Sequence, residues 1–206
     1  MHKYLILASF GLFLAFQGRS QLKFGMAAGY ESAVVSNPFN PLKPGGGFSY
    51  AFLLTAPVKK NFELHFDLDI ANWNSSYTGW APGGPRGIPL PTVYYTATPK
   101  ITHIVFPVTI CYTVPVKNAS LFAGMGLFMA NTHYSQPSSS FMGFGPSFTG
   151  GIRCKWGLVI TAEFRPAFGG SANHYTSDPA TFPIEGVKND YAFRIGYQFW
   201  QRKPHS

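Results

Sequence analysis

Alternation with a period of two governs most of this chain, in which bulky apolar residues take turns with small or polar ones. The clearest segment covers residues 61–72. Its apolar set is Phe62, Leu64, Phe66, Leu68 and Ile70, and its other set is Glu63, His65, Asp67, Asp69 and Ala71. Successive side chains of a strand point to opposite faces of a sheet, so the pattern predicts a strand with one apolar face. A helix would scatter the ionisable groups around its whole circumference.

The same alternation predicts eight strands of roughly ten residues each. They cover residues 22–31, 48–55, 61–72, 103–112, 121–129, 144–152, 158–168 and 190–199. The connections alternate in length: short ones at 56–60, 115–118 and 156–157, and long ones at 32–45, 73–98, 131–140 and 169–187. Short turns on one rim, long loops on the other and an even number of strands are typical of an outer-membrane barrel.

Composition indicates which face meets which environment. The chain is 17% aromatic and only 12% charged, whereas a soluble domain carries about 25% charged residues. The apolar face is uniformly bulky, and the other face mixes Gly, Ala, Ser, His and charged residues. We therefore predict an all-β fold, an eight-stranded antiparallel up-and-down transmembrane β-barrel with lipid outside and a polar lumen filled by side chains. A secreted, soluble lipocalin-like binder is the alternative.

The first twenty residues have the features of a secretory signal peptide. Lys3 precedes an apolar run over residues 4–16, and Gly18 and Ser20 supply small residues at positions −3 and −1. The run is too short to cross a bilayer as a helix, which needs roughly 20 apolar residues. We expect cleavage between Ser20 and Gln21, leaving residues 21–206 as one barrel domain. Loss of Lys3 and Arg19 lowers the formal net charge of +8 by two, to +6.

Three segments resemble the outer membrane protein β-barrel domain family of Bacteroidota, the PorT-like barrels. They are the apolar strand at 101–112 with an internal proline, the glycine-rich strand at 121–126 and the closing aromatic strand at 191–200. The proline-rich second long loop departs from the family pattern. The resemblance implies a barrel fold and an outer-membrane location, and most members have no assigned activity. Because proline cannot donate to a ladder, Pro107 predicts a bulge or a missing bond.

Five charged residues are expected to point into the lumen near mid-height: Asp67, Asp69, Glu163, Arg165 and Arg194. Isolated charges in a narrow, low-dielectric interior are costly, so we expect them to pair. A plug of salt bridges is the structural interpretation, and a gate or ion path is the functional one.

The sequence predicts no metal site and no cofactor. His65 and Cys111 are both expected to face the lumen on neighbouring strands, but two ligands do not make a site. The alternation places Cys111 inside and Cys154 outside, so their Cβ vectors would diverge and we expect two free thiols. No G-x-S-x-G or H-E-x-x-H motif is present, and we expect no enzyme. A lipid-modifying enzyme would have to use loop residues such as His133, Ser171 and His174.

The second long loop carries the residues expected to bind a ligand: Trp73, Tyr77 and Trp80. Aromatics on loops form binding surfaces for proteins or glycans, although Trp73 also suits a girdle at the membrane boundary. Lysines gather at the opposite rim, where anionic headgroups would lie. We expect as partners outer-membrane lipids, lipopolysaccharide and an unknown protein or glycan, and no nucleic acid.

We therefore expect a small, monomeric outer-membrane barrel with a structural, adhesive or recognition role through its long extracellular loops. The alternatives are a narrow pore, an accessory component of protein secretion, a membrane-embedded lipid-modifying enzyme, and the soluble binder.

Overall fold

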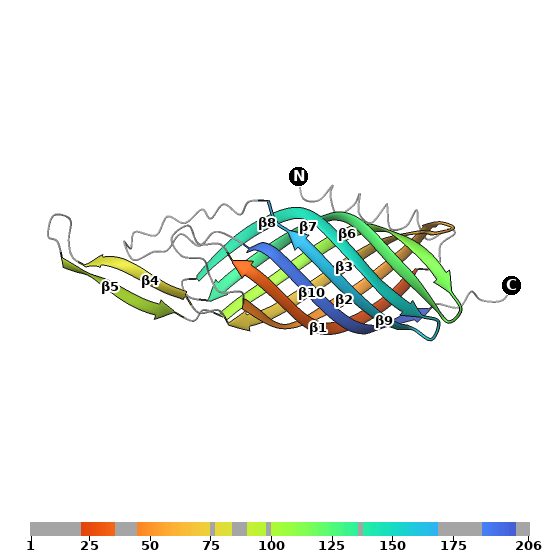
Figure 1. The fold of residues 1–206 in the computed structure, drawn as a ribbon, viewed down its shortest axis with the longest axis horizontal. Helices are drawn as coiled ribbons and strands as arrows, with labels where there is room; N and C mark the ends of the chain where they lie inside the picture. The colour runs from red at the N-terminus through yellow and green to blue at the C-terminus, as the bar shows by residue number, and fades with distance from the viewer. Residues whose placement is uncertain are drawn as a thin grey trace, which may run out of the picture.

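The computed structural model describes residues 22–35, 45–74, 77–83, 90–97, 100–135, 138–168 and 187–200. The predicted signal peptide lies outside these residues. Eight strands close into one antiparallel ring in the order β1-β10-β9-β8-β7-β6-β3-β2 (Figure 1). They are β1 (Lys23–Val35), β2 (Gly45–Lys59), β3 (Phe62–Asn74), β6 (Lys100–Val116), β7 (Ala119–Ser135), β8 (Ser138–Cys154), β9 (Leu158–Pro166) and β10 (Val187–Trp200). The predicted eight-stranded antiparallel barrel is confirmed.

The alternation sorts side chains between the outside and the lumen as predicted. On β7, exposed Leu121, Met125, Leu127 and Met129 alternate with buried or half-buried residues. Leu127 is 70% exposed, and across the barrel the exposed large residues are apolar or aromatic. Buried positions include many ionisable groups, so the usual distribution of a water-soluble protein is inverted. Within the described residues, no helix is long and apolar enough to cross a membrane.

The start of β1 and the end of β10 lie at the same rim of the barrel, because Lys23 pairs with Trp200. The short turns β2–β3, β6–β7 and β8–β9 lie at this rim too. The β8–β9 turn contains Gly157 at φ 106°, a backbone conformation that favours glycine. Lys59, Lys60, Lys117 and Lys155 are exposed at this rim. Both ends of the barrel chain therefore lie on the short-turn side, as an even strand number requires.

Two of the predicted long loops contain strands instead. The interval 73–98 holds a hairpin of β4 (Tyr77–Gly83) and β5 (Leu90–Ala97), which forms a separate two-stranded sheet beyond the long-loop end of the barrel (Figure 1). The prediction of a long loop over residues 131–140 is wrong: β7 continues to Ser135 and β8 starts at Ser138. Thr132 and Tyr134 stay buried while Asn131 and His133 stay exposed, so the alternation continues with polar residues outside.

The length of β6, β7 and β8 accounts for these polar ends. Each has 17 residues, which at a tilt of about 45° covers roughly 40 Å along the barrel axis. The apolar band of such a barrel is only about 25 Å tall. The strands therefore extend beyond the hydrocarbon, where outward polar residues meet water.

The ladder between β3 and β6 breaks at Pro107, as predicted. Pairing runs from Phe62↔Tyr112 to Phe66↔Val108 and resumes at Asp69↔Val105. The sum of the paired residue numbers is the same on both sides of the gap, so the register does not shift and no residue is bulged out. Proline has no N–H to donate, and the ladder loses its pairs locally without a change of alignment.

Substituting Leu127→Arg tests the lipid-facing assignment. A cation at the membrane mid-plane should lower the free energy of unfolding by about 2–4 kcal/mol, compared with about 0–1 kcal/mol near the rim. Val58→Arg is the matched control, because Val58 is 56% exposed close to the short-turn rim. Urea titrations in phospholipid vesicles measure both. Equal, near-zero effects would mean that the outer surface faces water.

Candidate functional site

A cluster of seven buried side chains fills the middle of the lumen. We call it the lumen charge network, and it consists of Glu31 on β1, Asp69 on β3, His103 on β6, Glu163 and Arg165 on β9, and Asp190 and Arg194 on β10. Each is less than one tenth exposed. Strand alternation aims all seven inward, and the register of the closed barrel brings them to a similar height.

Arg165 contacts all four carboxylates of the network. Its Nη2 lies 3.1 Å from Glu31 Oε2, its Nε 2.7 Å from Asp190 Oδ2 and its Nη1 3.3 Å from Glu163 Oε2. Its Nη1 also donates to Asp69 Oδ2. In the ring of strands β9 and β3 are four positions apart in either direction. The contact with Asp69 therefore joins opposite walls of the barrel.

Arg194 makes a second set of bridges to the same acids. Its Nη2 lies 2.8 Å from Asp69 Oδ2 and 3.1 Å from Glu31 Oε2, and its Nη1 lies 3.0 Å from Glu163 Oε1. Its Nε donates to Ser49 Oγ on β2 over 3.3 Å. A buried charge is tolerated when it is paired and hydrogen-bonded, and here the two guanidiniums share the carboxylates of Glu31, Asp69 and Glu163.

Four of the five predicted lumen residues belong to this network: Asp69, Glu163, Arg165 and Arg194. The fifth, Asp67, is only partly buried, hydrogen-bonds to the backbone of Leu54 and interacts electrostatically with Asp69, Glu163 and Arg194. Glu31, Asp190 and His103 are not among the predicted lumen residues. All three stand at inward positions of predicted strands, so the alternation contained the signal, but their heights in the barrel could not be compared.

A second buried cluster lies near the short-turn rim and centres on Glu63. Lys23 Nζ is 2.7 Å from Glu63 Oε1, Arg153 Nη1 is 2.8 Å from Glu63 Oε2, and His65 Nε2 is 3.4 Å from the same Oε2. The Arg153 guanidinium also stacks over Phe122, 5.3 Å from the ring centroid. This cluster fills the lumen with charge pairs near the short-turn rim.

Apolar side chains cover the lumen charge network at the long-loop end. This upper apolar layer consists of Ala33, Ala71, Trp73, Ile101, Tyr134 and Phe141. Trp73 is 4% exposed and packs edge-on against His103, with ring centroids 5.7 Å apart. The expectation that Trp73 belongs to a loop surface or a girdle is wrong, because its position in the alternation turns it inward.

The other predicted binding residues lie on the hairpin. Tyr77 pairs with Ala97 and Trp80 with Tyr94 across the backbone ladder of β4 and β5. The sequence pattern does not predict these strands, because the proline-rich stretch that separates β4 from β5 interrupts the alternation.

The cysteines and the outer histidine contribute no assembled site. Cys111 is buried, Cys154 is half-buried, and both are free thiols, as expected. His65 packs against Phe122 and hydrogen-bonds Glu63, not Cys111. His133 lies on β7, not in a loop, with Nδ1 3.0 Å from Ser140 Oγ. Ser171 and His174 lie outside the described residues.

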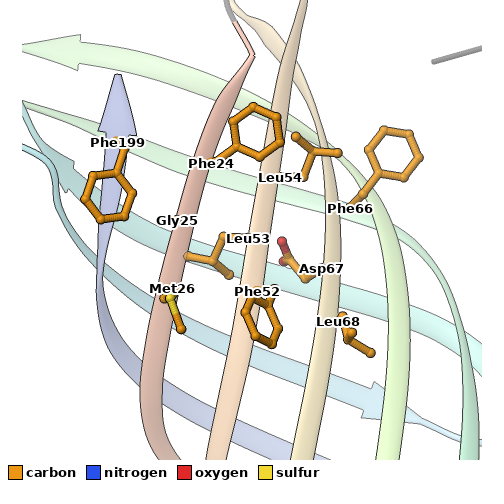
Figure 2. A pocket seen from close by; sticks show the side chains of 10 residues that line it. All are labelled: Phe24, Gly25, Met26, Phe52, Leu53, Leu54, Phe66, Asp67, Leu68 and Phe199. Carbon is orange, nitrogen blue, oxygen red and sulfur yellow. The ribbon is translucent and has the colours of Figure 1, made fainter. Parts of the chain in front are cut away.

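The outer wall carries an apolar groove of about 460 Å³ across β10, β1, β2 and β3. Figure 2 shows its outward side chains, which include Phe24, Phe52, Phe66 and Phe199, with Gly25, Leu53 and Asp67 in the row between them. This groove faces the same side as the lipid-facing residues. Its lining is apolar except for Asp67, which suits acyl chains better than a ligand held by several polar contacts.

A closed antiparallel ring of eight strands, an apolar exterior and a charged, filled lumen define a transmembrane β-barrel. Three solved structures with similar folds are the Neisserial surface protein A, the attachment invasion locus protein of Yersinia pestis bound to the heparin analogue sucrose octasulfate, and a major outer membrane protein from Thermus thermophilus.

The Neisserial protein is 12% identical with a TM-score of 0.52, over 85% of this chain and 95% of its own. The Yersinia protein is 13% identical with a TM-score of 0.42, and the Thermus protein 11% identical with 0.46. Each comparison covers 87% of this chain and 99% of the other. At such identities the similarity shows the fold alone. No family model and no curated protein matches the sequence, so the resemblance to PorT-like barrels stays a prediction.

Replacing Arg194 with methionine tests how strongly the barrel depends on its paired charges. Arg194→Met leaves buried carboxylates with one guanidinium fewer, which should cost about 3–5 kcal/mol of unfolding free energy. Lys155→Met removes an exposed cation and should have little effect. The double variant Arg194→Met/Glu163→Gln should recover part of the loss. Urea titration with folding followed by gel mobility measures all three, and an Arg194→Met variant as stable as Lys155→Met would disprove the dependence.

Proposed function

We propose that this protein is a bacterial outer-membrane barrel that presents its long-loop end, and above all the β4–β5 hairpin, for recognition of a protein or glycan. The proposal includes export by the signal peptide with cleavage between Ser20 and Gln21. It also includes action as a monomer without a catalytic step.

The observation that carries the proposal is the filled lumen. Buried side chains occupy it at three heights: the Glu63 cluster, the lumen charge network and the upper apolar layer. An eight-stranded barrel has an interior just wide enough for side chains. A role that depends on passage through the barrel is thus disfavoured, and the elements outside the membrane are left to perform the function.

The hairpin favours recognition over a purely structural role. In the β4–β5 sheet, Trp80 pairs with Tyr94, and the neighbouring Gly79 pairs with Tyr95. The two paired strands thus hold aromatic residues on a regular backbone. Tyr and Trp provide much contact area for little loss of side-chain entropy. Functional residues commonly lie on loops held by a rigid scaffold, and the ion-paired barrel is such a scaffold.

Planar-bilayer recordings test the closed lumen. The refolded protein should give no stepwise conductance under conditions in which a general porin does, because guanidinium–carboxylate bridges cross the lumen between opposite walls. Regular current steps that change in Asp69→Asn would contradict the closed lumen and favour the narrow pore.

Binding assays with matched tryptophan variants test the hairpin. Trp80→Ala should weaken binding of the refolded barrel to a responsive member of a glycan panel or to immobilised lipopolysaccharide by at least about tenfold, as at an aromatic hot spot. Trp156→Ala is the control, since Trp156 is 63% exposed at the opposite, short-turn rim. Equal effects of the two variants, or no binding by the parent protein, would contradict recognition of these ligands by the hairpin.

A further inference from the structure

Three side chains of the lumen charge network converge on one point from three strands. Glu31 of β1, His103 of β6 and Asp190 of β10 each offer a ligand atom, and these atoms lie within 4.8 Å of one another. His103 Nε2 is 3.6 Å from Asp190 Oδ2 and 3.9 Å from Glu31 Oε1. All three residues are at most 1% exposed.

These separations are too long for direct hydrogen bonds and suit atoms that share an ion. A nitrogen–oxygen hydrogen bond spans 2.7–3.2 Å, and a contact of 3.6 Å is not one. Two tetrahedral ligands, each about 2.0–2.2 Å from a zinc ion, lie about 3.4 Å apart. An imidazole nitrogen with two carboxylate oxygens is also a ligand set that divalent transition metals accept.

The atoms facing this point have no hydrogen-bond partner. They are His103 Nε2 and Glu31 Oε1, and Asp190 has an unsatisfied Oδ1 beside the Oδ2 that pairs with Arg165. Buried polar atoms are seldom left without hydrogen bonds, because the lost hydration is not replaced. Three such side chains pointing to one place therefore indicate that something else satisfies them together.

The imidazole of His103 is held as a metal-binding histidine usually is. Its Nδ1 lies 2.8 Å from Thr132 Oγ1 on β7, and Trp73 packs edge-on against the ring. A hydrogen bond at one ring nitrogen selects the tautomer that leaves a lone pair on the other. In the tautomer in which Nδ1–H donates to the Thr132 hydroxyl, the lone pair is on Nε2, the ring nitrogen that lies nearest the two carboxylates.

Charge balance in the middle of the lumen favours a cation. Among the described residues, the carboxylates of Glu31, Asp67, Asp69, Glu163 and Asp190 surround only the guanidiniums of Arg165 and Arg194. Carboxyl groups therefore outnumber guanidiniums five to two there, and the surplus carboxyl groups can hold a cation. Arg165 holds Glu31 through Oε2, so Glu31 Oε1 stays available on the side facing His103. Asp190 Oδ2 lies between the guanidinium and the imidazole, 2.7 Å from Arg165 Nε and 3.6 Å from His103 Nε2.

We propose that Glu31, His103 and Asp190 form a buried site for one divalent transition-metal ion, with zinc as the reference ion. The upper apolar layer covers the site at the long-loop end, so the ion enters as the barrel closes and then stays trapped. Its role is structural: it joins β1, β6 and β10 across the lumen. The proposal stands independently of any ligand at the hairpin.

Refolding with defined metal tests the site. The full chain is unfolded in denaturant with a chelator, freed of the chelator, and refolded into detergent micelles with zinc ions. It is then passed through a chelating column before metal is measured by mass spectrometry. Wild-type protein should retain zinc in a one-to-one ratio to chain, and His103→Gln and Asp190→Asn should retain only background levels. His65→Gln is the matched control, because His65 is an equally buried lumen histidine next to Glu63 and should keep its zinc.

Gel mobility before and after boiling identifies folded barrels, and only folded protein is counted. If both site variants fail to fold, the wild-type ratio still decides, together with its thermal transition, which should rise when zinc is present during refolding. The proposal is overturned if folded wild-type protein carries no zinc. It is equally overturned if the site variants retain as much zinc as wild type, or if His65→Gln loses as much as they do. In those cases His103 contacts the two carboxylates without a shared ion.

Discussion

Two guanidiniums surrounded by four carboxylates hold the interior of this barrel together. Arg165 and Arg194 come from neighbouring strands, β9 and β10, yet they contact acids from β1 and β3 as well as from their own strands. Removing such charges from water is costly, and only close pairing and hydrogen bonding offset that cost. The ring of strands must therefore close in one register, because a shift of a single residue would turn these side chains toward lipid.

The same alternation imposes opposite demands on the two faces of the wall. Outside, large apolar residues such as Leu127 and Phe52 meet hydrocarbon, and inside, ionisable residues must find one another. Small inward residues make this possible: a Cβ on Gly29 would lie within 2.7 Å of the Cα of Arg194. The missing side chain of Gly29 thus lets the backbone of β1 lie close to the backbone of β10 beside Arg194.

Closure also explains how the wall tolerates imperfect pairing. Backbone groups in a bilayer have to be satisfied within the protein, and a ring without edges does so. The missing pairs at Pro107 are confined to one place between β3 and β6, and Pro107 itself is buried on the lumen side.

Long β6, β7 and β8 continue beyond the apolar band, so the long-loop end begins on a rigid base. A filled, ion-paired lumen and an external hairpin together suit a scaffold for recognition better than a conduit.

The alternation along the chain specifies the fold class, all eight barrel strands and the inward face of each, since these follow from the local pleat and its period of two. It also indicates Asp69, Glu163, Arg165 and Arg194 as charges that share a lumen. Contacts between distant strands add what the alternation does not contain: that Glu31, His103 and Asp190 meet, that Trp73 covers them, and that residues 77–97 contain a hairpin. Glu31 and Asp190 are far apart in the chain, and their heights depend on how strands slide past one another when the ring closes. That alignment is set by pairing between distant segments, about which a local alternation carries no information.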